Sequence, residues 1–283
     1  MRVGFVILCY RKAEMVELCV SSLLKIKEIN FAKIVIVDNA SPDETGIKIM
    51  DMYKDSNNID VILKEKNTGY ADGNNIGFKY AVEKLECDTI VVLNSDVIII
   101  DENFLKKLYV SVQNNEKACI IAPDILEKKY GHVNPMDLNS LSKYSAFKNI
   151  IKNILANILL SIGVDYTKFR VKNNYNEKLV LPQSNFVPHG SCIVFTPKWT
   201  KNEGKAFCDK TFLFAEEYFL YAYLKEKNYR IILEPQLVVN HLGDGSIESK
   251  EKNDKSKRKF INCNQSKSLL SYIKFLNDPD SMW

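Results

Sequence analysis

The sequence predicts an α/β fold built on a mostly parallel sheet. Short, almost wholly apolar runs at residues 3–8, 33–37 and 89–93 alternate with segments of helical periodicity. Strands of β-branched and aliphatic residues without a polar face are typical of parallel strands buried on both sides. Because short links join these strands to helices, we expect a doubly wound sheet with helices on both faces.

The first 125 residues supply most of the expected elements. A turn at residues 9–12 follows the first strand and leads into an amphipathic helix over 13–26. Ser41 is the expected N-cap, and Pro42 the first residue, of a helix that runs to about residue 53. Further strands are expected at residues 60–64, 89–93 and 118–122, and further helices at 76–85 and 103–113.

Between residues 130 and 181 the alternation breaks down, and we expect an insertion over the site. Within it, residues 146–162 have the clearest helical pattern, with an apolar face and with Lys148, Lys152, Asn153 and Asn157 elsewhere. The apolar face contains Phe147, Ile150, Ile151, Ile154, Leu155, Ile158, Leu159 and Ile162. Two interpretations stay open: a helix packed on the body or on a second subunit, and a helix lying in a membrane interface.

The last third returns to strands and a helix and ends in a basic segment. A glycine-led strand is expected at 189–195, a helix from the Glu216–Glu217 pair to about 227, and strands at 229–234 and 237–240. Between residues 250 and 259 the surplus of basic over acidic residues is four, which equals the net charge of +4. The remainder is neutral, which argues against a broad nucleic-acid surface. The basic segment is either a solvated loop or a membrane-surface contact.

Composition favours a cytoplasmic protein. No apolar run resembles a signal peptide or reaches the ~18 residues needed to cross a bilayer. The seven cysteines are an odd number without a Cys-x-x-Cys pair, which is typical of reduced thiols. With only three histidines, a structural zinc site is not expected.

Polar groups follow several of the predicted strands. Asp38 ends the second strand, Asn94, Ser95 and Asp96 follow the strand at 89–93, and His241 closes the last one. Parallel strands place their carboxyl ends on one sheet edge, where open α/β sheets bind ligands. We therefore expect these groups to converge there.

Several stretches, in order along the chain, resemble the inverting nucleotide-sugar glycosyltransferases of family 2, which have the Rossmann-like GT-A fold. The resemblance is closest to the rhamnosyltransferase- and galactofuranosyltransferase-like branch. The matching stretches lie at residues 37–43, 67–77, 93–96, 190–192, 212–217 and 228–235, with His241. The resemblance implies a GT-A domain over 1–245, with a nucleotide-binding half at 1–125, a helical insertion at about 130–185 and an acceptor-binding half at 186–245. Residues 246–283 are then a basic C-terminal extension.

The resemblance implies a divalent cation, Mn²⁺ or Mg²⁺, that neutralises charge on the leaving diphosphate. Asp96 matches the metal-binding carboxylate of the Asp-x-Asp-like motif, and Asn94 stands at its first position. His241 matches a histidine that ligates the metal in some relatives. An ordinary hydrogen-bonded histidine at a strand end is the alternative.

The family's donor site maps onto the turns after the first strands. Asp38 matches the aspartate that hydrogen-bonds the donor base; an acidic acceptor suits the imide N–H of uracil or thymine, so a UDP- or dTDP-sugar is expected. The residues assigned to donor binding are Cys9, Tyr10, Arg11, Asp38, Asn39, Gly69, Asp72, Asn75, Asn94 and Ser95.

Inverting transfer needs a general base, and the family motif places it at Glu217, with Glu216 supporting it or binding acceptor. Two positions depart from the family pattern: Phe219 stands in place of an acidic residue and Tyr223 in place of an arginine.

The resemblance therefore implies a glycosyltransferase that acts on a saccharide or polyprenyl-linked saccharide acceptor in the synthesis of cell-surface polysaccharide. We expect it in the cytoplasm or on the inner face of the membrane. The alternative is a non-catalytic partner that binds nucleotide sugar. A nicotinamide-dependent dehydrogenase is excluded because no Gly-x-Gly-x-x-Gly follows the first strand.

Overall fold

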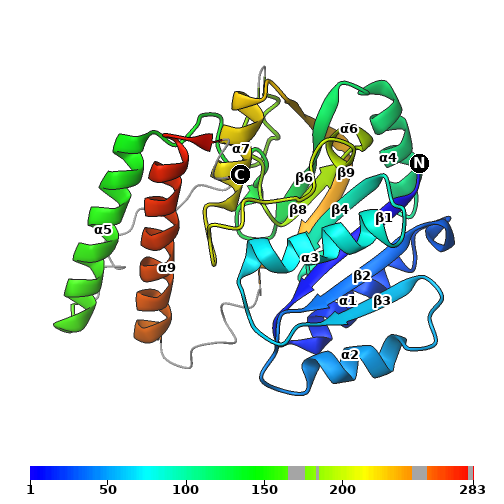
Figure 1. The fold of residues 1–283 in the computed structure, drawn as a ribbon, viewed down its shortest axis with the longest axis horizontal. Coiled ribbons are helices and arrows are strands. Elements are labelled where there is room, and N and C mark those ends of the chain that lie inside the picture. The colour runs from blue at the N-terminus through cyan, green and yellow to red at the C-terminus, as the bar shows by residue number, and fades with distance from the viewer. Residues whose placement is uncertain (165–175, 183–184, 244–253, 280–282) are drawn as a thin grey trace.

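The computed structural model describes residues 1–164, 176–182, 185–243, 254–279 and 283. Its strands form one nine-stranded sheet in the order β3-β2-β1-β4-β8-β6-β9-β5, with β7 paired to β6 (Figure 1). The strands are β1 (Val3–Cys9), β2 (Lys33–Asp38), β3 (Ile59–Leu63), β4 (Thr89–Asn94), β5 (Val97–Ile98), β6 (Ala118–Glu127), β7 (Gly131–His132), β8 (Cys192–Phe195) and β9 (Arg230–His241).

The sheet is mostly parallel. Strands β1 to β4 run parallel to one another, and so do β6 and β9, while β8 lies antiparallel between β4 and β6. The helices are α1 (Ala13–Leu23), α2 (Thr45–Tyr53), α3 (Tyr70–Glu83), α4 (Phe104–Asn114), α5 (Lys143–Ser161), α6 (Pro197–Thr200), α7 (Glu216–Glu226) and α9 (Asp254–Phe275).

Side chains of alternate strand residues belong to two separate hydrophobic cores, one on each face of the sheet. In β1, Phe5 and Ile7 pack with α1, α2 and α4, whereas Val6 packs on the other face with α3, α6 and α7. This is the two-residue period of a pleated strand with helices on both sides. The predicted α/β architecture is confirmed.

Several predicted boundaries are wrong: the first helix ends at Leu23 instead of residue 26, β6 runs to Glu127 instead of residue 122, and β8 starts at Cys192 instead of residue 189. The strands expected at 229–234 and 237–240 are one strand, β9, in which Pro235 to Leu237 bulge out between two stretches paired to β6. Helix α3 starts at Tyr70 instead of Ile76, because packing against β1 and β2 outweighs the low helix propensity of its Gly and Asn residues.

Ser41 does not cap α2, which begins at Thr45 without a side-chain cap. Its amide and hydroxyl instead donate to the carboxylate of Asp38, at 3.0 and 2.5 Å. Ser41 therefore closes the turn after β2 and is not available to the helix.

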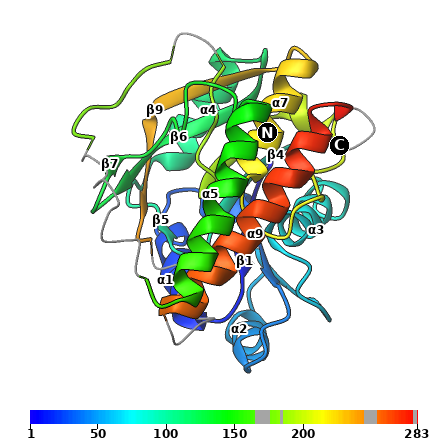
Figure 2. The same cartoon turned by 90° about the vertical axis from the view of Figure 1, so that its left-hand side faces the viewer.

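The C-terminal segment differs most from the expectation of a solvated loop. From Asp254 it forms the 22-residue helix α9, which lies beside α5 in both views (Figures 1 and 2). The two helices meet through small and polar groups: Ala146 and Ala156 are buried, Asn153 donates to Gln265, and Asn262 donates to Asn157. No helix in the described ranges is both long and apolar enough to cross a membrane.

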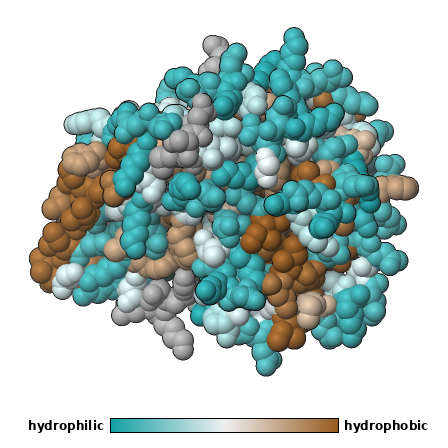
Figure 3. Space-filling model, viewed as in Figure 1, coloured by the Kyte–Doolittle hydropathy of each residue, from teal (hydrophilic) through white to brown (hydrophobic). Residues whose placement is uncertain are grey.

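The predicted apolar face of α5 consequently points away from the body. Side chains of Phe147, Ile154, Leu155, Ile158 and Ile162 are all at least half exposed. Figure 3 shows a hydrophobic band along the edge where α5 lies in Figure 1. The predicted amphipathic pattern is present, but the face with Asn153 and Asn157 is the one that packs within the chain.

Candidate active site

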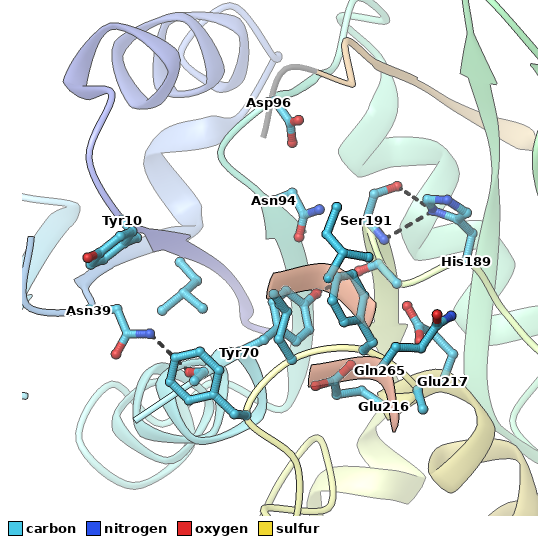
Figure 4. Close-up of a pocket in the computed structure, with 18 of the residues that line it drawn as sticks. Tyr10, Asn39, Tyr70, Asn94, Asp96, His189, Ser191, Glu216, Glu217 and Gln265 are labelled. Atoms are coloured by element: carbon cyan, nitrogen blue, oxygen red, sulfur yellow. Dashed lines mark hydrogen bonds between the residues drawn. The ribbon is translucent and has the colours of Figure 1, made fainter. Parts of the chain in front are cut away.

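The ends of three neighbouring strands form one wall of a deep cavity. Parallel register places Cys9 of β1 beside Asp38 of β2, and Leu8 beside Asn94 of β4. The cavity holds about 670 Å³, and residues 189–191, the segment 212–218 and the first half of α9 line its other walls (Figure 4). This volume is in the range of small-molecule sites.

Most of the predicted site residues line this cavity. They come from six segments far apart in the sequence, and the fold brings them together: Tyr10, Asn39, Gly69, Asn94, Ser95, Asp96, Glu216, Glu217 and His241. Cys9, Arg11, Asp38, Asp72 and Asn75 do not line it.

These five residues instead have contacts that shape the surrounding turns. The Ser41 hydroxyl, which donates to Asp38, accepts the amide of Arg11, so Asp38 ties the turn after β2 to the turn after β1. The Cys9 thiol donates to the carbonyl of Arg11. Asp72 pairs with Lys64 at 2.8 Å and contacts Thr68. Asn75 accepts the amides of Ala206 and Phe207 and donates to the carbonyl of Phe207. Their assignment to donor binding stays a prediction.

Gly69 is required where it stands. Its φ of +100° is unfavourable for L-residues, and a Cβ there would lie 2.3 Å from the carbonyl oxygen of Phe212. The close approach lets the amide of Tyr70 donate to that carbonyl at 2.8 Å. The loop after β3 is thereby fixed to the segment that carries Glu216 and Glu217.

Asp96 is 2% exposed, and its Oδ1 has no hydrogen-bond partner among the described residues. Nε2 of His241 lies 3.4 Å from this oxygen, which is an electrostatic contact. Nδ1 of His241 lies 2.6 Å from Oε1 of Glu127. Burial by itself would lower the pKa of His241, but the carboxylates of Asp96 and Glu127 outweigh it and raise the pKa to about 9.

A divalent cation fits this corner of the cavity. An unpartnered buried carboxylate oxygen costs free energy unless a cation or donor reaches it. Asp96 and Asn94 offer oxygen ligands and His241 an imidazole nitrogen, a set that suits Mn²⁺ and tolerates Mg²⁺.

The two glutamates begin α7 across the cavity, and they have different surroundings. Glu216 is 3% exposed and accepts the hydroxyl of Thr211 at 2.8 Å. Burial, reinforced by the charge of Glu217, raises the pKa of Glu216 to about 8. Burial also raises the pKa of Glu217, while a hydrogen bond from the backbone of Gly190 opposes the rise. Successive helix residues point about 100° apart, which separates the two carboxyl groups.

The backbone that presents these glutamates is strained. Phe214 and Ala215 both have positive φ, 75° and 72°, immediately before the helix. Such conformations in residues other than glycine cost on the order of 1–3 kcal/mol each and cluster at functional sites.

The two positions that depart from the family pattern pack toward the C-terminal segment. Phe219 is fully buried, with its ring centroid 4.9 Å from that of Phe275 and 5.2 Å from that of Tyr272. Tyr223 stacks on Trp283 at 4.0 Å. These aromatic residues thus hold α9, whose Lys257, Phe260, Ile261 and Gln265 line the cavity.

Comparison with known proteins agrees with this geometry. The family model described as "Glycosyl transferase family 2" matches residues 5–195, about two thirds of the chain. The chain belongs to glycosyl transferase family 2. The resemblance and the prediction of a glycosyltransferase are thereby confirmed at the level of the family.

Individual relatives of this family 2 chain match only part of it. The low-salt glycan biosynthesis hexosyltransferase Agl10 of Haloferax volcanii is 32% identical over 36% of this chain and 31% of its own length. The dTDP-rhamnosyl transferase RfbF of Shigella flexneri is 31% identical over 40% of this chain and 36% of its own. The matched segment is thus about a third of each curated relative's length.

Solved structures show the same fold at low identity. TarS of S. aureus in complex with UDP has a TM-score of 0.54 and 15% identity, over 85% of this chain and 60% of TarS. The mannosyltransferase PcManGT of Pyrobaculum calidifontis, in complex with GDP-Man and Mn²⁺, has a TM-score of 0.55 and 14% identity, over 96% and 69%. Both confirm the GT-A fold of this family 2 chain.

Sequence reasoning missed several cavity residues of this family 2 member. Tyr70 donates to the carbonyl of Gly190. Tyr70 and His189 lie in or next to stretches that match the family, so their sequence signal is the motif around them. The cavity-lining side chains of α9 and the contact of Glu127 with His241 have no local sequence signal.

Proposed function

We propose that this chain is a metal-dependent inverting glycosyltransferase that moves a sugar from a UDP- or dTDP-sugar to a hydroxyl of a saccharide or lipid-linked saccharide. The observation that carries the proposal is that one cavity brings together Asp96, His241 and Glu217 from three separate parts of the chain. Such an enzyme would act in the synthesis of cell-surface polysaccharide.

The reaction is a direct displacement at the anomeric carbon. The acceptor oxygen forms a bond to that carbon while the bond to the diphosphate oxygen breaks, and the diphosphate leaves with the electron pair. A cation held by Asp96, His241 and Asn94 would supply positive charge beside the leaving diphosphate. The proton of the acceptor hydroxyl passes to a carboxylate.

Glu217 is the proposed general base, because Glu216 has the environment of a protonated acid near pH 7. Burial and a neighbouring negative charge push the pKa of Glu216 to about 8. Two carboxyl groups in unequal surroundings commonly divide acid and base roles. Because the protonated Glu216 is neutral, it places no second negative charge beside Glu217.

Glu217→Gln tests this assignment. We expect kcat to fall about 10²–10⁴-fold, with nucleotide binding unchanged. Glu226→Gln, at the exposed end of the same helix, is the matched control and should leave kcat unchanged. Full activity of Glu217→Gln would show that Glu217 is not the general base and has no other role in catalysis.

A pyrimidine donor is proposed on two grounds. One is the family resemblance, which assigns base recognition to Asp38 at the end of β2, next to the cavity-lining Asn39. The other is that one relative is a dTDP-rhamnosyl transferase. Thermal shifts with UDP-, dTDP- and GDP-sugars, each with and without Mn²⁺, test the choice. Stabilisation by the GDP-sugar alone would contradict it.

The aromatic residues at 219 and 223 do not favour the non-catalytic alternative. Both bind the C-terminal segment, so their departure from the family pattern has a structural reason. Helix α9 places Lys257 and Gln265 on the wall of the same cavity that holds Glu217. We therefore assign acceptor selection to α9.

The exposed apolar face of α5 is proposed to lie on an anionic membrane surface that presents the lipid-linked acceptor. Helix α5 has no acidic residue and carries Lys143, Lys148 and Lys152. Basic residues 255 and 257–259 of α9 add charge of the same sign. Apolar insertion combined with positive charge is the pattern of interfacial helices.

Flotation with vesicles tests this contact. The protein should float with anionic vesicles and not with neutral ones, and a Phe147→Ser, Ile154→Ser, Ile158→Ser variant should stay in solution. Phe31→Ser, at an even more exposed apolar residue outside α5, is the control. Failure to float, or a dimer in sedimentation that the triple variant abolishes, would refute the membrane contact.

A further inference from the structure

Behind the proposed metal ligands lies a carboxylate that the cavity does not touch. Glu127 is the last residue of β6 and is not among the residues that line the cavity. Its Oε1 lies 2.6 Å from Nδ1 of His241 and 3.9 Å from Nε2 of His189. All three side chains are largely buried, so these contacts are shielded from water.

The sheet fixes this arrangement. Strands β6 and β9 are parallel, and their register pairs Glu127 with His241. Before that point the register shifts, because Pro235 to Leu237 of β9 have no partner on β6. Since a shift of one residue reverses the face of every following side chain, the bulge decides that His241 meets Glu127.

The hydrogen bonds define which nitrogen of each histidine carries a proton. Nδ1 of His189 accepts the amide of Ser191, which leaves the proton of a neutral His189 on Nε2, the atom nearer Glu127. Burial lowers the pKa of His189 to about 4, in agreement with a neutral ring. For His241, the short contact to Glu127 requires the proton on Nδ1, because a carboxylate accepts. Its Nε2 then faces Asp96 and the cavity.

We propose that Glu127 is a positioning residue that holds His241 with Nε2 available to a divalent cation, and that His189 supports Glu127 without binding the cation. The inference rests on the metal-dependent transfer proposed above. Metal-bound histidines commonly donate their second N–H to a carboxylate, which fixes the ring and increases its basicity.

The same three residues could instead be taken as a separate metal site, since one ligand atom of each lies within 4.8 Å of the others. The distances argue against it. Two atoms that share an ion at about 2.0–2.2 Å each lie more than 3 Å apart in tetrahedral geometry, whereas Glu127 and His241 are at hydrogen-bond distance. A proton, and not a metal, fits between them.

Mn²⁺ binding in the presence of UDP, measured by calorimetry, tests the role without relying on activity. Glu127→Ala should weaken Mn²⁺ binding about 10–100-fold. Glu127→Gln should weaken it less, because its amide oxygen still accepts from Nδ1 but lacks the charge. His189→Gln should leave Mn²⁺ affinity within a few-fold of the wild type.

The chain offers a matched control in Asp124, three residues earlier in β6. Its carboxylate contacts Nδ1 of His132 at 2.8 Å, the same chemistry away from the cavity. Asp124→Asn should reduce thermal stability as much as the Glu127 variants but leave Mn²⁺ affinity unchanged.

The outcomes separate the two proposals. Unchanged Mn²⁺ affinity in Glu127→Ala, or an equal loss in Asp124→Asn, would overturn the role of Glu127 and leave the proposed transferase intact. A loss in His189→Gln as large as in Glu127→Ala would favour the separate metal site and overturn the inference. A wild-type protein that binds no Mn²⁺ with UDP would refute the metal dependence itself, and this inference with it.

Discussion

Gly190 offers a way to displace the proposed base without changing its chemistry. A Cβ added at Gly190 would lie 2.2 Å from Oε1 of Glu217. Real Cβ contacts are essentially never below 3.0 Å, so the carboxylate of Glu217 must retreat by at least about 0.8 Å. Because Oε1 is the end of a flexible side chain, the side chain and not the backbone should move.

The size of the effect follows from this displacement. A misplacement of about 1 Å at a reacting group costs roughly 10²-fold in rate. We therefore expect Gly190→Ala to lower kcat about 100-fold, with nucleotide affinity unchanged and with a midpoint of thermal unfolding within a few degrees of the wild type. The residual rate should exceed that of Glu217→Gln, because the carboxylate is still present.

Steady-state transfer and thermal unfolding, measured on the same preparations, provide the assay. Gly204→Ala is the control, since a Cβ there meets no atom within 4 Å and its φ lies outside the left-handed region. Gly190→Ala with kcat within twofold of the wild type would refute the position of Glu217 at the reaction centre. A large loss of stability would instead mean that the backbone moves, contrary to the reasoning above.

Three further predictions follow from burial and charge. The pKa of Glu216 is about 8 in the folded protein against an ordinary 4.5, so folding takes up a proton between these two pH values. The contribution of Glu216 to the free energy of unfolding is therefore full below pH 4.5 and is lost as the pH rises to about 8. Denaturant unfolding should show Glu216→Gln gaining on the wild type by up to about 1.4 kcal/mol per pH unit in this window, and a constant difference would contradict the shift. Phe275→Ala removes a fully buried ring from the contact with Phe219 and should cost about 3–5 kcal/mol in unfolding free energy; a cost below about 1 kcal/mol would mean that α9 is not held there. Asp96→Asn removes one of the two carboxylates that raise the pKa of His241 to about 9, so NMR titration without metal should find the pKa of His241 nearer 6.5. An unchanged pKa would show that the Asp96 carboxylate does not stabilise the protonated imidazole.

The sheet and its ligand-binding edge could be predicted because their signals are local. An apolar run such as Thr89 to Leu93 reveals a buried strand, and its abrupt end in Asn94 marks the edge where strands of one direction meet. The family motifs are local as well, which is why the sequence alone points to Asp96, Glu217 and His241.

The errors and omissions lie where distant segments meet. Residue Ser41 has the chemistry of a helix cap, but Asp38 is a closer partner in the folded chain. Helix α5 has an evident apolar face, yet α9 covers the opposite one, because Asn153, Asn157 and the alanines fit the polar and small groups of α9.

By itself, then, the sequence determined the strands, the family and the chemistry of the residues at the strand ends, since each depends on neighbours within a few positions. Only the tertiary structure decided which partners those residues have. Glu127 pairs with His241, 114 residues later in the chain, because of the bulge at Pro235 to Leu237. The entry of α9 into the cavity wall depends on aromatic packing against α7. Such contacts arise from the register and packing of whole elements, and no stretch of sequence encodes them alone.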